Sequence, residues 1–474
     1  MKILFISTEA EPFAKSGGLG DVIGSLPREL NNMGLDARVM LPLYQSVEEK
    51  FSSQLEFLFD FKVELSWRTQ HCGLFKLEYE GVIFYFIDNK QYFGRENYYG
   101  YYDDGERCAY YAKAALESIS KIDFNPDILH CNEWQTALVP VYLKTHFKGN
   151  AIYDKLRTIF TIHNIEYQGK FEVNIFQDLL GISPADQGLV EYHGLVNYMK
   201  GAIVACDKLT TVSPSYAEEI TYPFYGRGLE DIIGENQYKL SGILNGIDTK
   251  RYDPTGDVNL AANYSINDYE KKSINKEKLQ KELNLNTEPD TPLIAMVSRL
   301  VEHKGFDLVL GVFDEIMEEK VQFAILGTGE VKYENFFRNK AIQYKGRVSF
   351  TTDFLPTLAS RIYAGSDLFL MPSVSEPCGL SQMIALRYGS IPIVRETGGL
   401  KDSIEAFIPD TGKGNGITFA TINAHDMLFA IKRGLKLYEN KKQWPILVKN
   451  GMGSDFSWEK PAREYVKIYK EIKA

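Results

Sequence analysis

A chain of 474 residues is too long for one ordinary hydrophobic core, so we expect two or three domains. Its 44% hydrophobic and 24% charged residues are typical of a globular protein. The net charge of −10 argues against nucleic acid or an anionic membrane as a partner, because both favour a basic surface.

The cysteines, histidines and apolar runs indicate the compartment of the protein and what it does not bind. Five scattered cysteines form no Cys-x-x-Cys pair, which is typical of reduced thiols in a cytoplasmic protein. The chain enters a short strand without a signal-peptide pattern, and no apolar run approaches the roughly 20 residues of a membrane span. The seven histidines lack metal-ligand spacing. We expect a cytoplasmic protein that binds neither a metal nor a membrane.

A glycine-rich loop follows the first apolar run. The strand expected at Ile3–Ile6 leads to Lys15, Gly17 and Gly18, and an amphipathic helix begins directly afterwards. Glycines let a ligand approach the backbone, a helix N-terminus favours an anion, and Lys15 adds a positive charge. The loop therefore suits a phosphate or diphosphate. It matches neither the dinucleotide nor the P-loop spacing, so a purely structural strand-to-helix turn is the alternative.

A second copy of this pattern lies far along the chain. The segment 398–404 repeats the Gly-Gly-Leu-x-Asp-x-Ile pattern of residues 17–23 and also follows an apolar strand, Ile391–Val394. Two similar loops suggest two similar α/β halves that each offer a glycine turn to a shared cleft.

The first half, up to about residue 245, alternates short apolar runs with helical patterns. Strands are expected at Ile3–Ile6, Val39–Leu41, Asp127–His130, Thr158–Ile162 and Leu209–Val212, with a hairpin of Phe75–Tyr79 and Val82–Ile87. Near-continuous apolar strands indicate a parallel sheet, and ligands of such sheets bind at the carboxyl ends of the strands.

The segment 92–111 is rich in tyrosine, including Tyr98 and Tyr99. Aromatic faces beside hydrogen-bonding groups suit sugar rings, although these tyrosines could equally pack and cap the first domain. Polar clusters around Glu133 and His163 each follow a strand directly. Either residue could serve in acid–base chemistry, but a lone histidine is more often simply hydrogen-bonded in place.

The turn Asn245-Gly246-Ile247-Asp248 marks the expected domain boundary, and the second half then restarts the alternation. Its strands are expected at Leu293–Val297, Gln322–Leu326, Val348–Phe350, Leu368–Met371 and Ile391–Val394. The last helix, within 458–474, is expected to return to the first domain. The domains are therefore 1–245, completed by that helix, and 246–457.

Two polar segments follow strands of the second half. Arg299 and Lys304 could bind a diphosphate from one side, although two solvated surface residues could have the same spacing. Glu376 comes before a Pro-Cys-Gly turn and offers a hydrogen-bond acceptor. Cys378 is expected to be a small buried thiol because nothing basic is adjacent to it in sequence.

Taken in order, six motifs resemble those of the bacterial glycogen synthases and plant starch synthases. They are K-S-G-G-L-G-D-V, T-I-H-N-I-E-Y-Q-G, N-G-I-D, S-R-L-x-x-x-K-G, E-P-C-G-L-S-Q and T-G-G-L. The resemblance implies an α/β protein of the GT-B class, with two Rossmann-like parallel-sheet domains facing across a cleft. It also implies a hexosyltransferase that moves glucose from ADP-glucose to the non-reducing end of an α-1,4-glucan such as glycogen, with retention and without a metal or other cofactor.

The resemblance also implies roles for particular residues. Catalytic roles fall on His163, Arg299, Lys304 and Glu376. Contacts with the nucleotide sugar fall on Lys15, Gly17, Gly18, Asp21, Asn245, Phe354, Cys378, Gly379, Leu380, Thr397 and Gly398. Contacts with the glucan fall on Tyr98, Tyr99, Glu133 and Trp134.

Three departures from the family pattern stand out. Ser16 replaces the usual Thr, Glu133 replaces an Asp, and Val374-Ser375 replaces an Arg-aromatic pair. The same motifs leave three alternatives open: UDP-glucose as the donor, a glucan phosphorylase that needs a pyridoxal phosphate lysine, and a non-catalytic glucan-binding scaffold.

Overall fold

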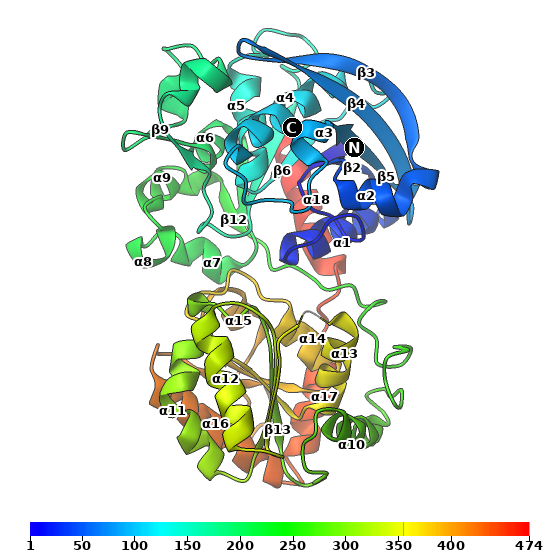
Figure 1. Ribbon diagram of the computed structural model, residues 1–474, viewed down its shortest axis with the longest axis vertical. Coiled ribbons are helices and arrows are strands. Elements are labelled where there is room, and N and C mark those ends of the chain that lie inside the picture. Colours follow the sequence, from blue (N-terminus) through cyan, green and yellow to red (C-terminus); the bar gives the residue numbers. More distant parts are fainter. Residues whose placement is uncertain (354, 474) are drawn as a thin grey trace. The chain divides into compact units, whose positions relative to one another are not determined.

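The computed structural model describes residues 1–353 and 355–473, so Phe354, an expected contact of the nucleotide sugar, lies outside the described residues. The chain divides into two compact units (Figure 1). The first unit is Met1–Gly246 together with the segment from Trp458 onwards, and the second unit is Ile247–Ser457. The two-domain α/β class expected from the sequence is confirmed.

The first unit is built on a nine-stranded sheet with the order β12-β11-β7-β6-β1-β2-β5-β4-β3. The strands from β12 to β5 are parallel, whereas β4 and β3 are antiparallel. The strands are β1 (Lys2–Ile6), β2 (Asp36–Pro42), β3 (Glu56–Leu65), β4 (Arg68–Tyr79), β5 (Val82–Asp88), β6 (Ile128–Asn132), β7 (Arg157–Ile162), β11 (Lys208–Thr211) and β12 (Leu240–Gly242). A separate small sheet contains β8 (Lys170–Phe171), β10 (Leu195–Asn197) and β9 (Glu191–Tyr192).

Helices cover this sheet and join its strands. They are α1 (Gly18–Asn32), α2 (Gln45–Phe51), α3 (Lys90–Phe93), α4 (Asp104–Ile119), α5 (Leu138–Lys144), α6 (Tyr198–Ala205), α7 (Pro214–Glu219), α8 (Pro223–Gly226), α9 (Glu230–Glu235) and α18 (Glu459–Lys473). The C-terminal helix α18 packs beside α1 in this unit, as the red and dark blue helices of Figure 1 show. Its Tyr469 hydroxyl lies 2.8 Å from Nδ1 of the buried His130 in β6.

The second unit contains a fully parallel six-stranded sheet with the order β15-β14-β13-β16-β17-β18. Its strands are β13 (Leu293–Val297), β14 (Gln322–Leu326), β15 (Val348–Thr351), β16 (Leu368–Met371), β17 (Ile391–Arg395) and β18 (Ile417–Phe419). Its helices are α10 (Lys272–Glu282), α11 (Phe306–Glu318), α12 (Val331–Gln343), α13 (Pro356–Gly365), α14 (Ser381–Arg387), α15 (Gly398–Ser403), α16 (Ala424–Glu439) and α17 (Trp444–Met452).

The order of this sheet reverses at its first strand. Sequential strands run outwards from β13 on one side through β14 to β15, and on the other side through β16 to β18. Parallel α/β sheets bind ligands at such a switch point, outside the carboxyl ends of the strands. The segments that leave β13 and β16 are therefore the first place to look for a site.

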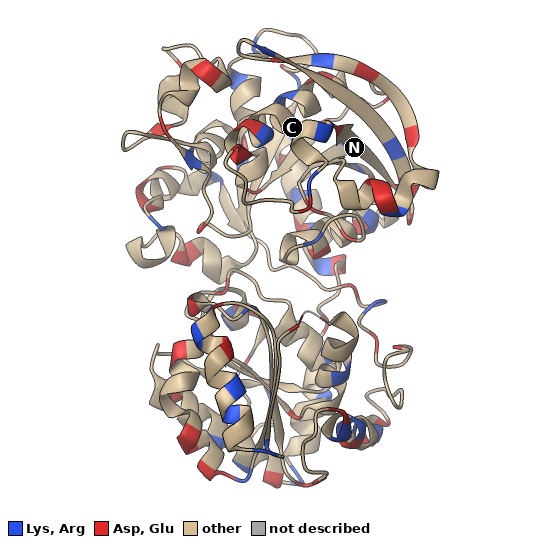
Figure 2. Ribbon diagram, in the orientation of Figure 1, with Lys and Arg blue, Asp and Glu red and all other residues tan. Residues whose placement is uncertain are grey.

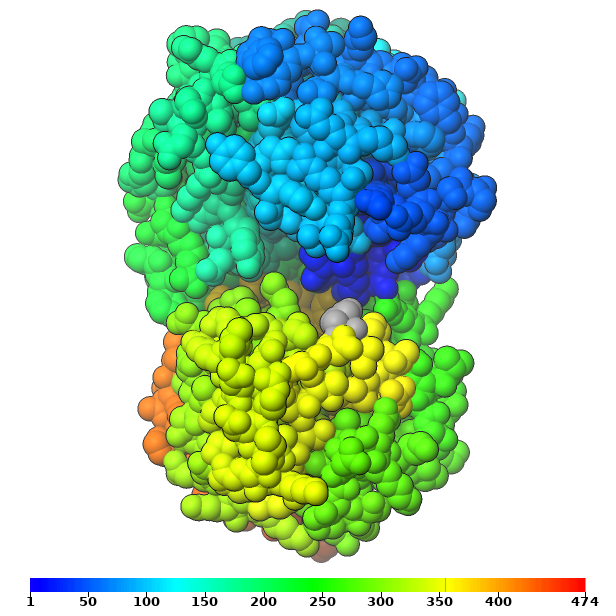
Figure 3. Space-filling model, in the orientation of Figure 1, coloured from blue at the N-terminus to red at the C-terminus, as the bar shows by residue number. Residues whose placement is uncertain are grey.

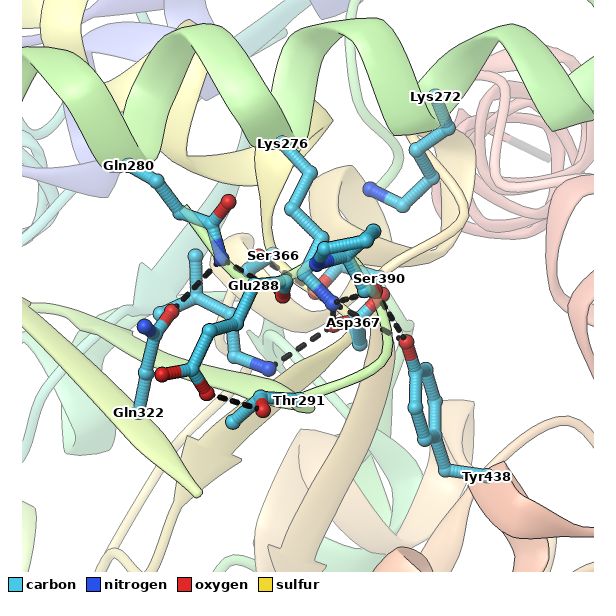
Figure 4. Close-up of polar contacts among 12 residues, drawn as sticks. Lys272, Lys276, Gln280, Glu288, Thr291, Gln322, Ser366, Asp367, Ser390 and Tyr438 are labelled. Carbon is cyan, nitrogen blue, oxygen red and sulfur yellow. Dashed lines mark hydrogen bonds and ion pairs between the residues drawn. The ribbon is translucent and has the colours of Figure 1, made fainter. Parts of the chain in front are cut away.

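The helix α10 is fastened to the second sheet by buried polar groups (Figure 4). The Lys276 ammonium lies 2.7 Å from the Asp367 carboxylate and donates a 3.0 Å hydrogen bond to the Tyr438 hydroxyl. One turn earlier, the buried Lys272 donates to the carbonyl oxygens of Tyr363 and Ala364, at 3.0 and 2.6 Å, in the last turn of α13. These bonds satisfy carbonyl groups that a helix end would otherwise leave unpaired.

Acidic and basic residues are intermingled on the helices of both units (Figure 2), so the net charge of −10 is spread over the molecule. Within residues 1–353 and 355–473, no helix is long and apolar enough to cross a membrane. All five cysteines are buried and free.

Replacing Lys272 with Met should flatten the dependence of stability on pH. Burial lowers the pKa of Lys272 to about 7, despite the opposing effect of Asp367. The unfolded lysine keeps its proton up to its ordinary pKa of 10.5, so between these values the unfolded chain binds more protons and stability rises with pH. Urea unfolding across pH 7–10 should show a wild-type slope of at most about 1.4 kcal/mol per pH unit from this group. Lys272→Met should lose that slope, whereas Lys281→Met, an exposed position on the same helix, should keep it.

Candidate active site

The segment after β13 carries Arg299 and ends in a short 3-10 helix, Glu302–Lys304. Gly305 then opens α11 with φ +76°, where a Cβ atom would lie 2.0 Å from the carbonyl oxygen of Pro372. Only glycine permits this approach to the segment that leaves β16. It brings Lys304 to Glu376, which lies in that segment.

Lys304 and Glu376 form an ion pair in which one ammonium group contacts both carboxylate oxygens. The lysine Nζ lies 2.7 Å from each carboxylate oxygen, and the Ser373 hydroxyl donates a further bond of 2.9 Å to Oε2. Glu376 is buried, with 5% of its surface exposed. Burial by itself would raise the pKa of Glu376, but the Lys304 charge and these hydrogen bonds outweigh it and leave the pKa below its usual value. The carboxylate is therefore ionised.

The turn after Glu376 packs against the second glycine pair. A Cβ atom on Gly398 would lie 2.1 Å from the Glu376 carbonyl oxygen, and one on Gly399 would lie equally close to that of Cys378. The Gly399 amide donates to the Glu376 carbonyl at 3.1 Å. These glycines therefore permit backbone contact at the start of α15. Thr397 and Gly398, expected beside the phosphates, are both buried.

Other predicted residues of the second unit lie around this pair. Cys378 is buried, whereas Gly379 and Leu380 are half-buried, and Gly379 has φ +73°. The Arg299 guanidinium is exposed and makes no hydrogen bond or ion pair with a residue that the structure describes. The sequence prediction missed Ser373 and the buried Arg395, which donates to the carbonyl oxygens of Ser373 and Val374 at 2.7 and 2.6 Å.

In the first unit, the glycine-rich loop is organised by Glu9, a residue that the sequence prediction also missed. The Glu9 carboxylate accepts hydrogen bonds from the Ser16 amide and hydroxyl, each at 2.6 Å, and from the Gly17 amide at 3.3 Å. Lys15 lies between two other carboxylates, with Asp21 at 2.6 Å and Glu11 at 3.0 Å. The only sequence signal for Glu9 is its place just after the first strand.

Gly17 and Gly18 are exposed, and the fold does not require the first of them to be glycine. Gly17 has φ −162°, an extended conformation open to any residue, and a Cβ atom there would have nothing within 4 Å. The space above Gly17 is therefore available for a ligand to approach the backbone.

The polar clusters after β6 and β7 meet in the first unit. The buried Glu133 has φ +67° and accepts hydrogen bonds at 2.5 and 2.7 Å from the amides of His163 and Asn164. Burial raises the pKa of Glu133 to about 7, because only backbone amides oppose it there, and no cation among the described residues pairs with Glu133 as Lys304 pairs with Glu376. A strained left-handed glutamate is characteristic of functional sites.

His163 is held in one tautomer. Its Nε2 lies 3.0 Å from Oδ1 of Asn132, whose amide group donates to the carbonyl oxygens of Ile6 and His130. Asn132 therefore accepts, and His163 donates from Nε2. Burial lowers the pKa of His163 to about 3, so the imidazole is neutral.

The remaining predicted residues of the first unit also have defined places. The Tyr99 hydroxyl donates to Glu9 at 3.0 Å, and the ring of Tyr98 lies 4.7 Å from that of Tyr44. Trp134 is half-buried against Gly169, where a Cβ atom would lie 2.4 Å from its ring. Oδ1 of the buried Asn245 has no hydrogen-bond partner among the described residues, so it could accept a bond from a ligand.

In the part of the chain that the structure describes, no group of three or more His, Cys, Asp or Glu side chains could hold a metal ion.

Comparisons with known proteins cover both units. The family model for the starch synthase catalytic domain matches residues 2–235, and that for glycosyl transferases of group 1 matches residues 275–446. Proteins named glycogen synthase from Desulforamulus reducens and Alkaliphilus metalliredigens are 50% and 47% identical to this chain. Each alignment covers all of this chain, with 99% of the first relative and 100% of the second.

A solved structure of a starch synthase also matches this chain over its full length. The catalytic domain of starch synthase IV from Arabidopsis thaliana, bound to ADP and acarbose, matches with a TM-score of 0.90 and 34% identity, covering 100% of this chain and 99% of that one. The fold and the comparisons define a glycosyltransferase of the GT-B class. Within that class, the chain belongs to the family of bacterial glycogen synthases and plant starch synthases.

Replacing Lys304 with Met should destabilise the protein, because it leaves the buried Glu376 carboxylate without its cation. Removing one partner of a buried pair typically costs about 3–5 kcal/mol. In urea unfolding, the double variant Lys304→Met/Glu376→Gln should recover part of this loss. Lys340→Met provides a control, since it breaks a pair with the 61%-exposed Asp314 and should cost less than about 1 kcal/mol. A Lys304→Met variant as stable as wild type would show that the pair contributes no net stability.

Proposed function

We propose that the protein is a glycogen synthase. It transfers glucose from ADP-glucose to the non-reducing 4-hydroxyl of an α-1,4-glucan and retains the anomeric configuration. The proposal draws on the relatives named glycogen synthase and on the ADP bound in the starch synthase IV structure. The observation that carries it is the Lys304–Glu376 pair at the switch point of the second sheet, with the exposed Arg299 in the same segment after β13 as Lys304. The five free, buried thiols suit a cytoplasmic protein.

Arg299 and Lys304 would stabilise the departing nucleoside diphosphate. The exposed Arg299 guanidinium, which pairs with none of the described residues, can bind a phosphate through two parallel hydrogen bonds. The Lys304 ammonium has three N–H groups, of which two donate to Glu376. The third can donate a hydrogen bond to a phosphate oxygen of the nucleotide. Positive groups fixed where negative charge develops supply a large part of many catalytic effects.

Glu376 would anchor the transferred glucose and not attack it. Both of its oxygens are occupied by Lys304, and one also by Ser373, so its negative charge is already compensated. A carboxylate nucleophile for double displacement needs a free oxygen behind the anomeric carbon. We therefore favour attack from the face that the leaving group departs, with a phosphate oxygen assisting removal of the acceptor proton.

His163 would lie near the anomeric carbon as a neutral group. Its low pKa keeps the imidazole uncharged, so it would not repel the positive charge that develops on the sugar. Lys15, Gly17, Gly18, Asp21 and Asn245 would contact the donor from the first unit. Tyr98, Tyr99, Glu133 and Trp134 would contact the glucan.

The assay of this proposal measures nucleotide release and polymer growth with glycogen and either ADP-glucose or UDP-glucose. We expect ADP-glucose to be the better donor. Arg299→Ala should lower kcat by about 10²–10³-fold, the usual loss for one group that stabilises developing charge. Arg338→Ala, an exposed arginine of the same unit, should leave kcat unchanged. Absence of transfer from either donor would refute the function, and an unimpaired Arg299→Ala would refute only the role of that residue.

Gly17→Ala should separate function from stability. Apart from its chain neighbours, no described residue would lie within 4 Å of its Cβ atom, so the melting temperature should not fall. If the donor phosphates approach the backbone here, the added methyl group should raise KM for ADP-glucose by about tenfold, a cost near 1.4 kcal/mol. Gly256→Ala, also without neighbours within 4 Å, should change neither quantity. A Gly17→Ala enzyme with wild-type KM would place the phosphates elsewhere.

A further inference from the structure

The strand β3 forms one edge of the first sheet, and its outer side pairs with no strand that the structure describes. It has 10 residues, whereas the other edge strands of the two large sheets, β12, β15 and β18, have 3 or 4 residues each. In Figure 1, β3 lies at the rim of the first unit, and the blue atoms of its hairpin form part of the surface in Figure 3. A long free edge is a template for pairing with another strand, unless its side chains prevent it.

The hairpin turn determines which residues of β3 point their backbone groups outwards. Leu65 and Arg68 face each other across a two-residue turn, so they are a hydrogen-bonded pair. Hydrogen-bonded and non-hydrogen-bonded pairs alternate along an antiparallel ladder, and this ladder has no register shift between Phe59 and Leu65. The amide and carbonyl groups of Asp60 and Lys62 therefore point away from β4.

The exposed side chains of this edge alternate in charge. Asp60, Lys62 and Glu64 are all exposed and follow one another on the same face of the strand. A row of charges of one sign would prevent two copies of the edge from pairing, because like charges directly opposite each other repel. A row of alternating sign instead permits pairing in a register that places opposite charges across from each other.

A symmetric pair of β3 strands has one register that satisfies this row over most of the strand. With the two-fold axis at Phe61, Asp60 of each copy lies opposite Lys62 of the other, so the attraction occurs twice. An axis at Asp60 or at Lys62 would place that residue opposite its own copy, which brings two like charges together. An axis at Val63 would overlap fewer residues, because the strand ends at Leu65.

The same register brings aromatic side chains together. Phe61 lies at a non-hydrogen-bonded position of the new ladder, where opposite side chains approach each other most closely. It is half-buried, and its ring centroid lies 6.1 Å from that of Phe59, which is also half-buried. Opposite aromatic and β-branched side chains stabilise a strand pair, and here Phe61 would meet its own copy and Phe59 would meet Val63. Pairing would therefore bury apolar surface that one chain leaves partly exposed.

We propose that two copies of this chain pair through their β3 edges, antiparallel about an axis at Phe61, and join their nine-stranded sheets into one. The backbone groups of Asp60 and Lys62 form the new ladder, and the two Asp60–Lys62 pairs fix its register. This inference concerns assembly, and it does not depend on the proposed function.

Sedimentation equilibrium of the full chain tests the assembly. The wild type should have about twice the chain mass of 53.9 kDa at micromolar concentrations. Asp60→Lys and Lys62→Asp each place like charges opposite each other twice, so each variant should sediment as a monomer. An equimolar mixture of the two variants should form dimers again, because both pairs across the axis would join opposite charges. Glu172→Lys, the same charge change at another exposed position of the first unit, should remain a dimer.

Oxidative crosslinking tests the register. In the proposed dimer the two Phe61 Cα atoms lie about 4.5 Å apart, a separation that a disulfide can span. Phe61→Cys should therefore give a covalent dimer on a non-reducing gel. Wild type should not, because its five cysteines are buried. Phe59→Cys should not crosslink either, because the two copies of that position would be offset by about four residues, or roughly 13 Å.

Three results would overturn the proposal: a monomeric wild type, charge variants that both remain dimers, or a mixture of them that stays monomeric. Crosslinking of Phe59→Cys as readily as Phe61→Cys would overturn it as well. Neither measurement involves glucose transfer, so each of these results would leave the proposed function intact.

Discussion

The ion pair of Lys304 and Glu376 holds together the two segments that leave β13 and β16. A carboxylate with 5% of its surface exposed is costly unless a cation and hydrogen bonds replace its water. Lys304 and Ser373 supply them, and Gly305 permits the backbone approach that places the lysine within 2.7 Å. The position of Glu376 in turn fixes the Pro-Cys-Gly turn and the start of α15, because both pack against its main chain.

In the first unit, the buried carboxylate of Glu133 also holds two segments together, but its surroundings differ in charge from those of Glu376. Glu133 ties the end of β6 to the segment after β7 through two amide hydrogen bonds, without the cation that Glu376 has. Amide dipoles offset less of the burial cost than a full positive charge at contact distance does. The pKa of Glu133 therefore rises to about 7, whereas that of Glu376 falls. Glu133 can exchange a proton near neutral pH, and Glu376 remains an anion.

The sequence was most informative where burial is continuous. Strands such as β1 and β14 are buried almost throughout and appear as unbroken apolar runs. The edge strand β3 was missed, because its partly exposed side chains leave no such run. The motifs singled out Lys304 and Glu376 separately as candidates, but no local pattern shows that residues 72 positions apart form an ion pair. Glu9 was missed for the same reason: its partners are the amides of Ser16 and Gly17 and the hydroxyls of Ser16 and Tyr99, which form no local sequence pattern with it.

Local compensation of charge differs between the two units, which matters for anion binding by a protein with a net charge of −10. Lys15 faces two carboxylates, and the Ser16 and Gly17 amides already donate to Glu9, so the glycine-rich loop has little positive potential to spare. In the second unit, one carboxylate balances Lys304, and Arg299 is uncompensated by any described residue. The diphosphate should therefore derive most of its binding energy from the second unit.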